Sequence, residues 1–331
     1  MNMLVASKKN LMPSGFTLIE LLVAITISLF VLAGVGVVMV SSRSTYEAQD
    51  FNARLQENAR FAIQFLSHDL RMAGYWGCAS NLSGGDPLAV SANSYTSIKG
   101  ATVGVGDDLT IEYADPTYSL NVTSALKGSS AIASVEANSG DSSQFEDGDT
   151  IVIADCAGAE KVTISADPAV TGSVVNLTVS PALTRNYINN AEVRLFTSRA
   201  YSVALNGQNI PTLKLDGADL VQGVELMRFL FGLDSDGDGA PNSYVNRSSS
   251  PDLSTAVSVQ TGILVRSISN YRNPNSDSND TREFGTVKGQ ENDGKYDILD
   301  LDVNTVGAAI DDLRVNRHVF TTTLKVRNKA I

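Results

Sequence analysis

One apolar run near the N-terminus constrains this chain more than any other feature. The 25 residues from Phe16 to Val40 are almost unbroken hydrocarbon. As an α-helix this run would be about 37 Å long, which is enough to cross a hydrocarbon core of about 30 Å with some tilt. We therefore predict a transmembrane helix over residues 16–40.

A single acidic side chain, Glu20, lies four residues inside the edge of this run. An acid in a membrane helix costs several kcal/mol and marks a function or a partner. The hydroxyls of Thr17, Thr26 and Ser28 are less costly, because a helix can bond them to its own carbonyls. In the alternative interpretation, Glu20 lies close enough to the membrane interface to snorkel or become protonated.

The residues that flank the run set its orientation and exclude ordinary signal-peptide cleavage. Lys8 and Lys9 precede the run, and the first 15 residues contain no acid, so the N-terminus is expected in the cytoplasm and the rest of the chain is exported. Residues 38–43 offer no small-residue cleavage site after the run. Gly15, directly before Phe16, offers a site on the other side.

The sequence GFTLIELLVA, from Gly15 to Ala24, resembles the class III leader of type IV pilins and pseudopilins. The resemblance implies that a prepilin peptidase cleaves after Gly15, so that residues 1–15 are a leader and Phe16 becomes an N-methylated terminus. It implies that Glu20 pairs with the terminal amine of a neighbouring subunit during assembly. The mature chain would wait in the inner membrane as a single-pass protein with a periplasmic head, and then move to the pilus on the cell surface.

Helical periodicity continues beyond the apolar run. Between residues 41 and 73, apolar side chains recur at three- and four-residue steps, with charged residues on the other faces. The apolar positions are Phe51, Leu55, Ala59, Ala62, Phe65 or Leu66, and Ala73. We predict an amphipathic continuation of the helix that stops at Gly74, followed by a head over residues 74–331.

The sequence of the head predicts a β-rich domain, because short β-prone runs alternate with Gly, Asn, Asp, Ser and Pro. The best candidate strands are residues 109–113, 150–154, 161–165, 173–179, 193–205, 220–233, 257–267 and 318–326. Residues 270–295 are interpreted as an exposed insertion. The predicted fold class is α+β and pilin-like, with a long N-terminal helix packed on a β-rich head.

The chain contains two cysteines, Cys78 and Cys156. In an exported domain this pair predicts one disulfide, which would close a loop of about 78 residues and stabilise the head by roughly 4.5 kcal/mol in the chain-entropy model. The alternative is a pair of unpaired buried thiols. His68 and His318 show no ligand spacing that would add a structural zinc site.

The overall charge disfavours nucleic acid as a partner. The formal net charge is −11, and removal of a leader with two lysines leaves 23 basic against 36 acidic residues, a net charge of −13. Such a surface repels phosphate backbones.

Motifs typical of enzymes are not found in the sequence. There is no G-x-S-x-G, and residues 289–295 have the spacing of a phosphate-binding loop but are followed by Tyr296 in place of the required Ser or Thr. We expect no enzymatic activity.

One acidic loop could bind a cation. Asp234, Asp236 and Asp238 alternate with Ser235, Gly237 and Gly239, an arrangement that can surround calcium with oxygen. Position twelve of an EF-hand would be Val245, so a shorter nine-residue loop is expected. Its ligands would be Asp234, Asp236, Asp238, the Ala240 carbonyl and Asn242. The alternative is a solvated acidic turn, and calcium would be an optional cofactor.

The order of several head segments is similar to that of PilW-type minor pilins, relatives of the J-type minor pseudopilins. These segments are residues 75–78, 151–156, 220–225 with 231–234, 264–267 and 323–328. The resemblance implies a low-copy subunit that helps initiate type IV pili together with other minor pilins and the major pilin, at the fibre tip. Two alternatives stay open: a minor pseudopilin of a type II secretion system, and a pilin-anchored calcium-binding adhesin or hydrolase.

Overall fold

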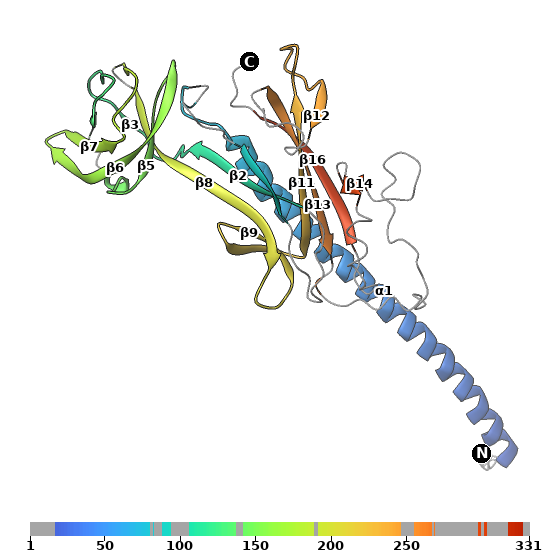
Figure 1. Ribbon diagram of the computed structural model, residues 1–331. Helices are drawn as coiled ribbons and strands as arrows, with labels where there is room; N and C mark the ends of the chain where they lie inside the picture. Colours follow the sequence, from blue (N-terminus) through green and yellow to red (C-terminus); the bar gives the residue numbers. More distant parts are fainter. Residues whose placement is uncertain are drawn as a thin grey trace, which may run out of the picture. The chain divides into compact units, whose positions relative to one another are not determined.

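The computed structural model describes residues 17–79, 82, 88–93, 106–136, 142–188, 191–245, 255–266, 268, 297–298, 301–302 and 317–326 (Figure 1). The chain divides into two compact units, residues 1–52 and 53–331. The helix α1 (Leu18–Met72) contributes to both units.

In the first unit, α1 carries the apolar run. Thr17 lies at the helix start, where its Oγ1 accepts a hydrogen bond from the Glu20 amide at 3.3 Å, as an N-cap does. Thr26 Oγ1 donates to the carbonyl oxygens of Leu22 and Val23 at 3.1 and 2.8 Å. Hydroxyls inside the run therefore bond to the helix itself, as predicted.

In the second unit, α1 buries one face. The buried apolar side chains follow one another at steps of three or four residues: Leu55, Ala59, Ala62, Leu66 and Leu70. After Met72 the backbone turns at Gly74, whose φ of 70° lies in the left-handed region that glycine adopts without strain. The helix therefore ends within two residues of the predicted stop.

Ten antiparallel strands of the head form one sheet around the long strand β8 (Glu192–Leu205). Along the main path, the order is β1 (Leu88–Asn93), β2 (Gly106–Ala114), β8, β5 (Thr150–Asp155), β6 (Gly158–Thr171), β7 (Val174–Ser180) and β4 (Ile132–Glu136). Off this path, β3 (Leu120–Asn121) and β9 (Pro211–Leu215) also pair with β8, and β10 (Ala218–Gln222) pairs with β9. The short 3-10 helix η1 (Ser142–Gln144) precedes β5.

A second antiparallel sheet has four strands, in the order β12 (Ser243–Val245), β11 (Val224–Leu233), β13 (Ala256–Arg266) and β16 (Arg317–Lys325). The hairpin strands β14 (Asp297–Ile298) and β15 (Leu301–Asp302) pair with each other. Side chains of β11 and β13 are buried along nearly the whole of both strands. These two strands lie at the centre of the sheet, and even their polar residues Glu225, Ser258 and Thr261 are buried.

The head has separate hydrophobic clusters. The first combines the buried face of α1 with side chains of β2, β8, β9, β11, β13 and β16. The second is formed within β3 to β8, and includes Phe145, Ile151, Leu177 and Val193. A helix packed on a strand-rich head confirms the predicted α+β class.

A disulfide joins Cys78 to Cys156, 78 positions apart in sequence, with their Cα atoms 4.7 Å apart. The neighbouring cluster contains Trp76, Ala79 and Ala154, so the cross-link ties the segment after α1 to the end of β5 beside a buried tryptophan. Each of the two cysteines present in the chain is thereby paired.

The predicted strand over residues 220–233 is wrong in one respect, because it is two strands, β10 and β11. Gly223 separates them with a φ of 88°. A Cβ built on Gly223 would lie 2.7 Å from the Arg266 carbonyl oxygen. The Gly223 carbonyl accepts a hydrogen bond from the Arg266 amide at 2.7 Å. The close approach to β13 therefore requires glycine, and the chain changes sheets there.

Candidate functional site

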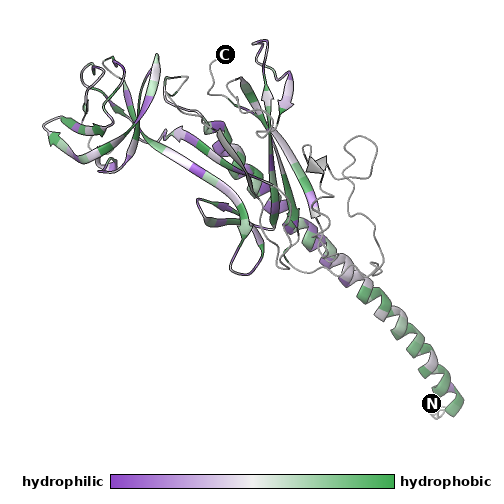
Figure 2. Ribbon diagram, viewed as in Figure 1, coloured by the Kyte–Doolittle hydropathy of each residue, from purple (hydrophilic) through white to green (hydrophobic). Residues whose placement is uncertain are grey.

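The apolar half of α1 carries the first predicted site. Figure 2 shows this half as hydrophobic, and its side chains are exposed. Among the residues that the structure describes, α1 is the one helix long and apolar enough to cross a membrane. The side chains of Phe30 and Met39 are 82% and 73% exposed. A continuous apolar surface of this size marks a site that contacts a membrane or another protein.

Glu20 is the one ionisable residue between Thr17 and Ser42. Its backbone amide is held by Thr17 at the start of α1, and its side chain is exposed among Leu18, Ile19 and Leu21. An acid on such an apolar surface is free to meet a group on another molecule. Gly15 and Phe16, the predicted cleavage and methylation positions, lie outside the described residues, as does the leader.

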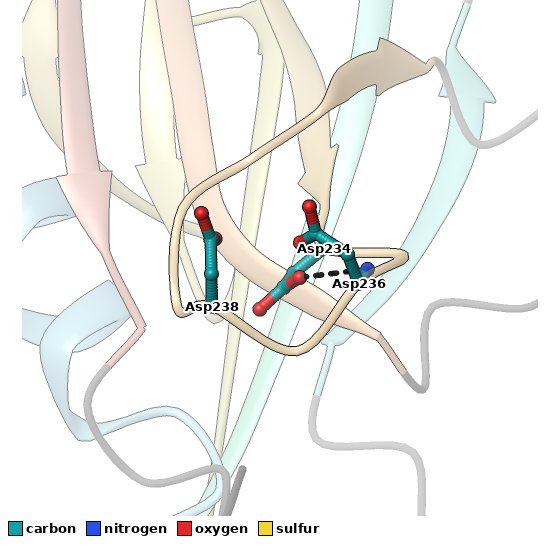
Figure 3. A group of neighbouring side chains, drawn as sticks. All are labelled: Asp234, Asp236 and Asp238. Carbon is teal, nitrogen blue, oxygen red and sulfur yellow. Dashed lines mark hydrogen bonds between the residues drawn. The ribbon is translucent and has the colours of Figure 1, made fainter.

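The acidic loop after β11 forms the second predicted site. Figure 3 shows Asp234, Asp236 and Asp238 in this loop, and one carboxylate oxygen from each lies within 4.8 Å of the others. Asp234 is buried at the base, whereas the other two side chains are exposed. Gly237 and Gly239, with φ of 79° and 83°, let the loop turn back on itself.

Backbone amides stabilise the negative charge on Asp234 by donating hydrogen bonds to its carboxylate. Its Oδ1 accepts from the amides of Asp236 and Gly237 at 3.2 and 2.7 Å, and its Oδ2 accepts from Gly239 at 2.7 Å. Burial raises the pKa of Asp234, but these amide hydrogen bonds outweigh burial and hold the pKa below its ordinary value. The stabilisation from this carboxylate is therefore present above its ordinary pKa and is lost as the pH falls through the lowered value.

The structure brings together part of the predicted ligand set. The three carboxylates converge, and their hard oxygen atoms are the donors that calcium takes. The Asn242 side-chain oxygen instead accepts from the Ser235 amide at 2.7 Å, and its Nδ2 donates to Asp236 Oδ2 at 3.2 Å. Asn242 thus closes the loop by hydrogen bonds. The three aspartates fit a calcium ion, and binding stays a prediction.

Buried ionic contacts in the head join residues that no sequence motif links. Asp107 on β2 accepts from Arg228 Nη1 at 3.1 Å and from the Phe229 amide at 2.9 Å, which links β2 to β11. Burial raises the pKa of Asp107, although both of these contacts oppose the rise. Asp107 and Arg228 are 121 positions apart, and neither belongs to a motif. These contacts join β2 to β11.

Comparisons with known proteins agree with the architecture. The family described as Type IV Pilus-assembly protein W matches residues 175–328, and the Prokaryotic N-terminal methylation motif matches residues 12–36. The first match covers β7 to β16, most of the second half of the head, and the second includes Glu20. The two matches therefore fall on the apolar helix and on the sheets that pack around its continuation.

One curated relative is the Pilin-like protein PilA3 of Thermus thermophilus, 40% identical over 106 residues. The match covers 31% of this chain and spans about two-fifths (42%) of the relative. Among solved structures, the Phage phi92 endosialidase aligns with 55% of this chain and 34% of its own, at 11% identity. Its TM-score of 0.16 is too low to carry an argument.

The methylation motif, the apolar helix and the β-rich head define the class of the type IV pilins. The match to the PilW family over residues 175–328, the match to the methylation motif and the pilin-like relative together support a type IV minor pilin of the PilW type. These similarities imply a structural role. The motif implies processing by a prepilin peptidase and association with other pilins, and together with the apolar helix it points to membrane anchoring.

Proposed function

We propose that this protein is a low-copy minor pilin that helps initiate type IV pili, in a complex with other minor pilins and the major pilin at the fibre tip. The observation that carries the proposal is the PilW match over residues 175–328 of the head. A leader alone would fit any pilin or pseudopilin. The match over the head supports a pilus-assembly protein in particular among the pilins and pseudopilins.

Assembly would start from the inner membrane, with the N-terminus cytoplasmic and the head periplasmic. After cleavage at Gly15, the apolar half of α1 waits in the bilayer with Glu20 inside the apolar region. A buried carboxylate is costly in lipid. Pairing Glu20 with the terminal amine at Phe16 of a neighbouring subunit removes that cost, and the apolar helices then pack on one another. Because this pairing removes the cost of holding the Glu20 carboxylate in lipid, it favours movement of the subunit from the bilayer into the fibre.

The build of the head supports a terminal position. The second hydrophobic cluster, within β3 to β8, gives the head a core additional to the one around α1. Subunits along a helical fibre must fit their heads beneath those of the next turn. A head with an additional lobe is easier to accommodate at the tip, where no subunit follows.

Deletion of the gene tests this function. We expect loss of surface pili and twitching, both restored by the wild-type chain. Gly15→Ala should accumulate uncut precursor, whereas Glu20→Ala should be cleaved normally and fail to restore pili. The alternative of a type II pseudopilin predicts intact pili with blocked release of secreted proteins, and that result would reject the proposal.

A further inference from the structure

Strand β16 forms one edge of the four-stranded sheet. It pairs with β13 in an unbroken antiparallel register of nine residues, from Arg317 opposite Arg266 to Lys325 opposite Ser258. No strand among the described residues pairs with its other side. Nine residues without bulge or proline make a regular strand about 30 Å long, and one side of its backbone has no partner strand in the part of the chain that the structure describes.

The register shows which backbone groups face outward. The Val326 amide donates to the Val257 carbonyl oxygen at 2.9 Å, so residue 326 points its peptide groups toward β13. Because this direction alternates along an antiparallel strand, Phe320, Thr322 and Leu324 also bond to β13. The amides and carbonyls of the odd-numbered residues from 317 to 325 then point away from the sheet.

Three other edge strands among the described residues have features that hinder the addition of a further strand, and β16 lacks these features. At the opposite edge of the same sheet, β12 has only three residues. In the larger sheet, the outer side of β4 is contacted by a bridge between Val122 and Val135, and the Thr123 amide donates to the Ser134 carbonyl at 2.9 Å. Strand β10 has five residues and an irregular register. Short, bulged or covered edges resist strand addition, whereas a long regular edge invites it.

The charge of β16 indicates what kind of strand fits. Arg317 and Lys325 stand at its two ends and no acid lies between them, in a chain with 36 acidic residues. In the antiparallel pairing of two copies that uses all nine residues, Arg317 of one copy would lie opposite Lys325 of the other. Like charges directly opposite are unfavourable. A second copy of this chain is therefore a poor occupant.

We propose that the free edge of β16 binds an extended strand of a different protein chain, with an acidic residue opposite each end of β16 and β-branched or apolar residues between. Main-chain hydrogen bonds to the odd-numbered residues would provide affinity, and the two acids would set the register. On the solvent face, the partner's side chains would meet Thr321 and Thr323, both exposed. The inference rests on the geometry of the sheet and not on the role in pilus initiation.

A nine-residue peptide probes this edge directly. The probe has Glu at both ends and alternating Thr and Val between them, and its counterpart has Lys at both ends. With the full mature chain in detergent, we expect the Glu-ended peptide to slow hydrogen exchange of the amides of 319, 321, 323 and 325. The Lys-ended peptide should bind about fivefold more weakly or worse, because two attractive cross-strand pairs become repulsive. Slow exchange of these amides before any peptide is added would overturn the proposal.

Variants separate strand addition from general peptide adhesion. Thr323→Pro removes an outward donor at a position where an edge strand tolerates proline, and it should abolish binding while the Phe320, Thr322 and Leu324 amides stay protected. Thr323→Val keeps the donor and should bind normally. Lys325→Glu should reduce the preference for the Glu-ended peptide. Equal binding by Thr323→Pro and Thr323→Val, or an unchanged preference in Lys325→Glu, would sink the proposal.

Discussion

Asp69 and Tyr201 form a buried polar contact between α1 and the head. Asp69, on the buried face of α1, accepts a hydrogen bond from the Tyr201 hydroxyl at 2.6 Å, and its other oxygen lies 2.9 Å from His68 Nδ1. Burial, together with the Asp69 carboxylate, raises the pKa of Tyr201. The hydroxyl therefore stays protonated and donates, which fastens α1 to β8.

Loss of this hydroxyl tests the contact. Tyr201→Phe leaves a buried carboxylate oxygen without its donor, so we expect the free energy of unfolding to fall by about 1–3 kcal/mol, measured by chemical denaturation. Tyr46→Phe, at a side chain that is 73% exposed, is the matched control and should change stability little. The raised pKa also means that the Tyr201 contribution is complete below about pH 10 and declines as the pH rises toward the raised value.

A second residue-scale prediction concerns the acidic loop. If Asp234, Asp236 and Asp238 bind calcium, millimolar calcium should raise the thermal midpoint of the protein, because a ligand that binds only the folded state stabilises it by RT ln(1 + [L]/Kd). The double variant Asp236→Asn, Asp238→Asn should lose the increase. Asp167→Asn, at an exposed position of β6, should keep it. An unchanged wild-type midpoint would leave the loop as a solvated turn.

At the scale of elements, Gly223 decides where β10 ends and β11 begins. Gly223→Ala places a Cβ 2.7 Å from the Arg266 carbonyl oxygen at a φ of 88°. We expect the free energy of unfolding to fall by about 1–3 kcal/mol, measured by denaturant titration. Gly207→Ala is the control, since a Cβ added at Gly207 would meet nothing within 4 Å, and it should stay within about 0.5 kcal/mol of wild type. Equal stability of the two variants would contradict the assigned role of Gly223.

Some of the strands could be predicted from sequence patterns, and others could not. Alternation in residues 318–326 matches β16, where Leu324 is buried while Thr321, Thr323 and Lys325 are exposed. Val326, directly after the strand, is buried as well. Strand β9 was missed because it begins with Pro211 and has only five residues, and its identity depends on pairing with β8. The break at Gly223 was missed because glycine inside an apolar run shows neither its φ nor the carbonyl beside it.

For the candidate site, local spacing was informative and long-range contacts were not. The alternate positions of Asp234, Asp236 and Asp238 predicted their convergence, because a glycine-containing loop brings such residues together. The hydrogen bonds of Asn242 with Ser235 could not be foreseen, since amide orientation depends on the folded loop. Asp69 and Tyr201 are 132 positions apart, and no periodicity links them.

At the scale of the whole molecule, one chain combines an apolar helix suited to lipid with a head that has its own hydrophobic clusters. Lipid favours the first half of α1, whereas the head is folded around the second half and cross-linked by the Cys78–Cys156 disulfide. Under the proposed function, the chain would leave the bilayer with its head folded. That property suits a subunit which is first a membrane protein and then part of a fibre.

The most direct test is the mass of the N-terminal peptide of this protein in fibres sheared from the cell surface. We predict a low-abundance peptide that begins at Phe16, carries a methyl group on its terminal amine and lacks residues 1–15. Cells that express Glu20→Ala should yield the same peptide from membranes but not from fibres. A chain that retains residues 1–15, or that is absent from wild-type fibres, would contradict the account.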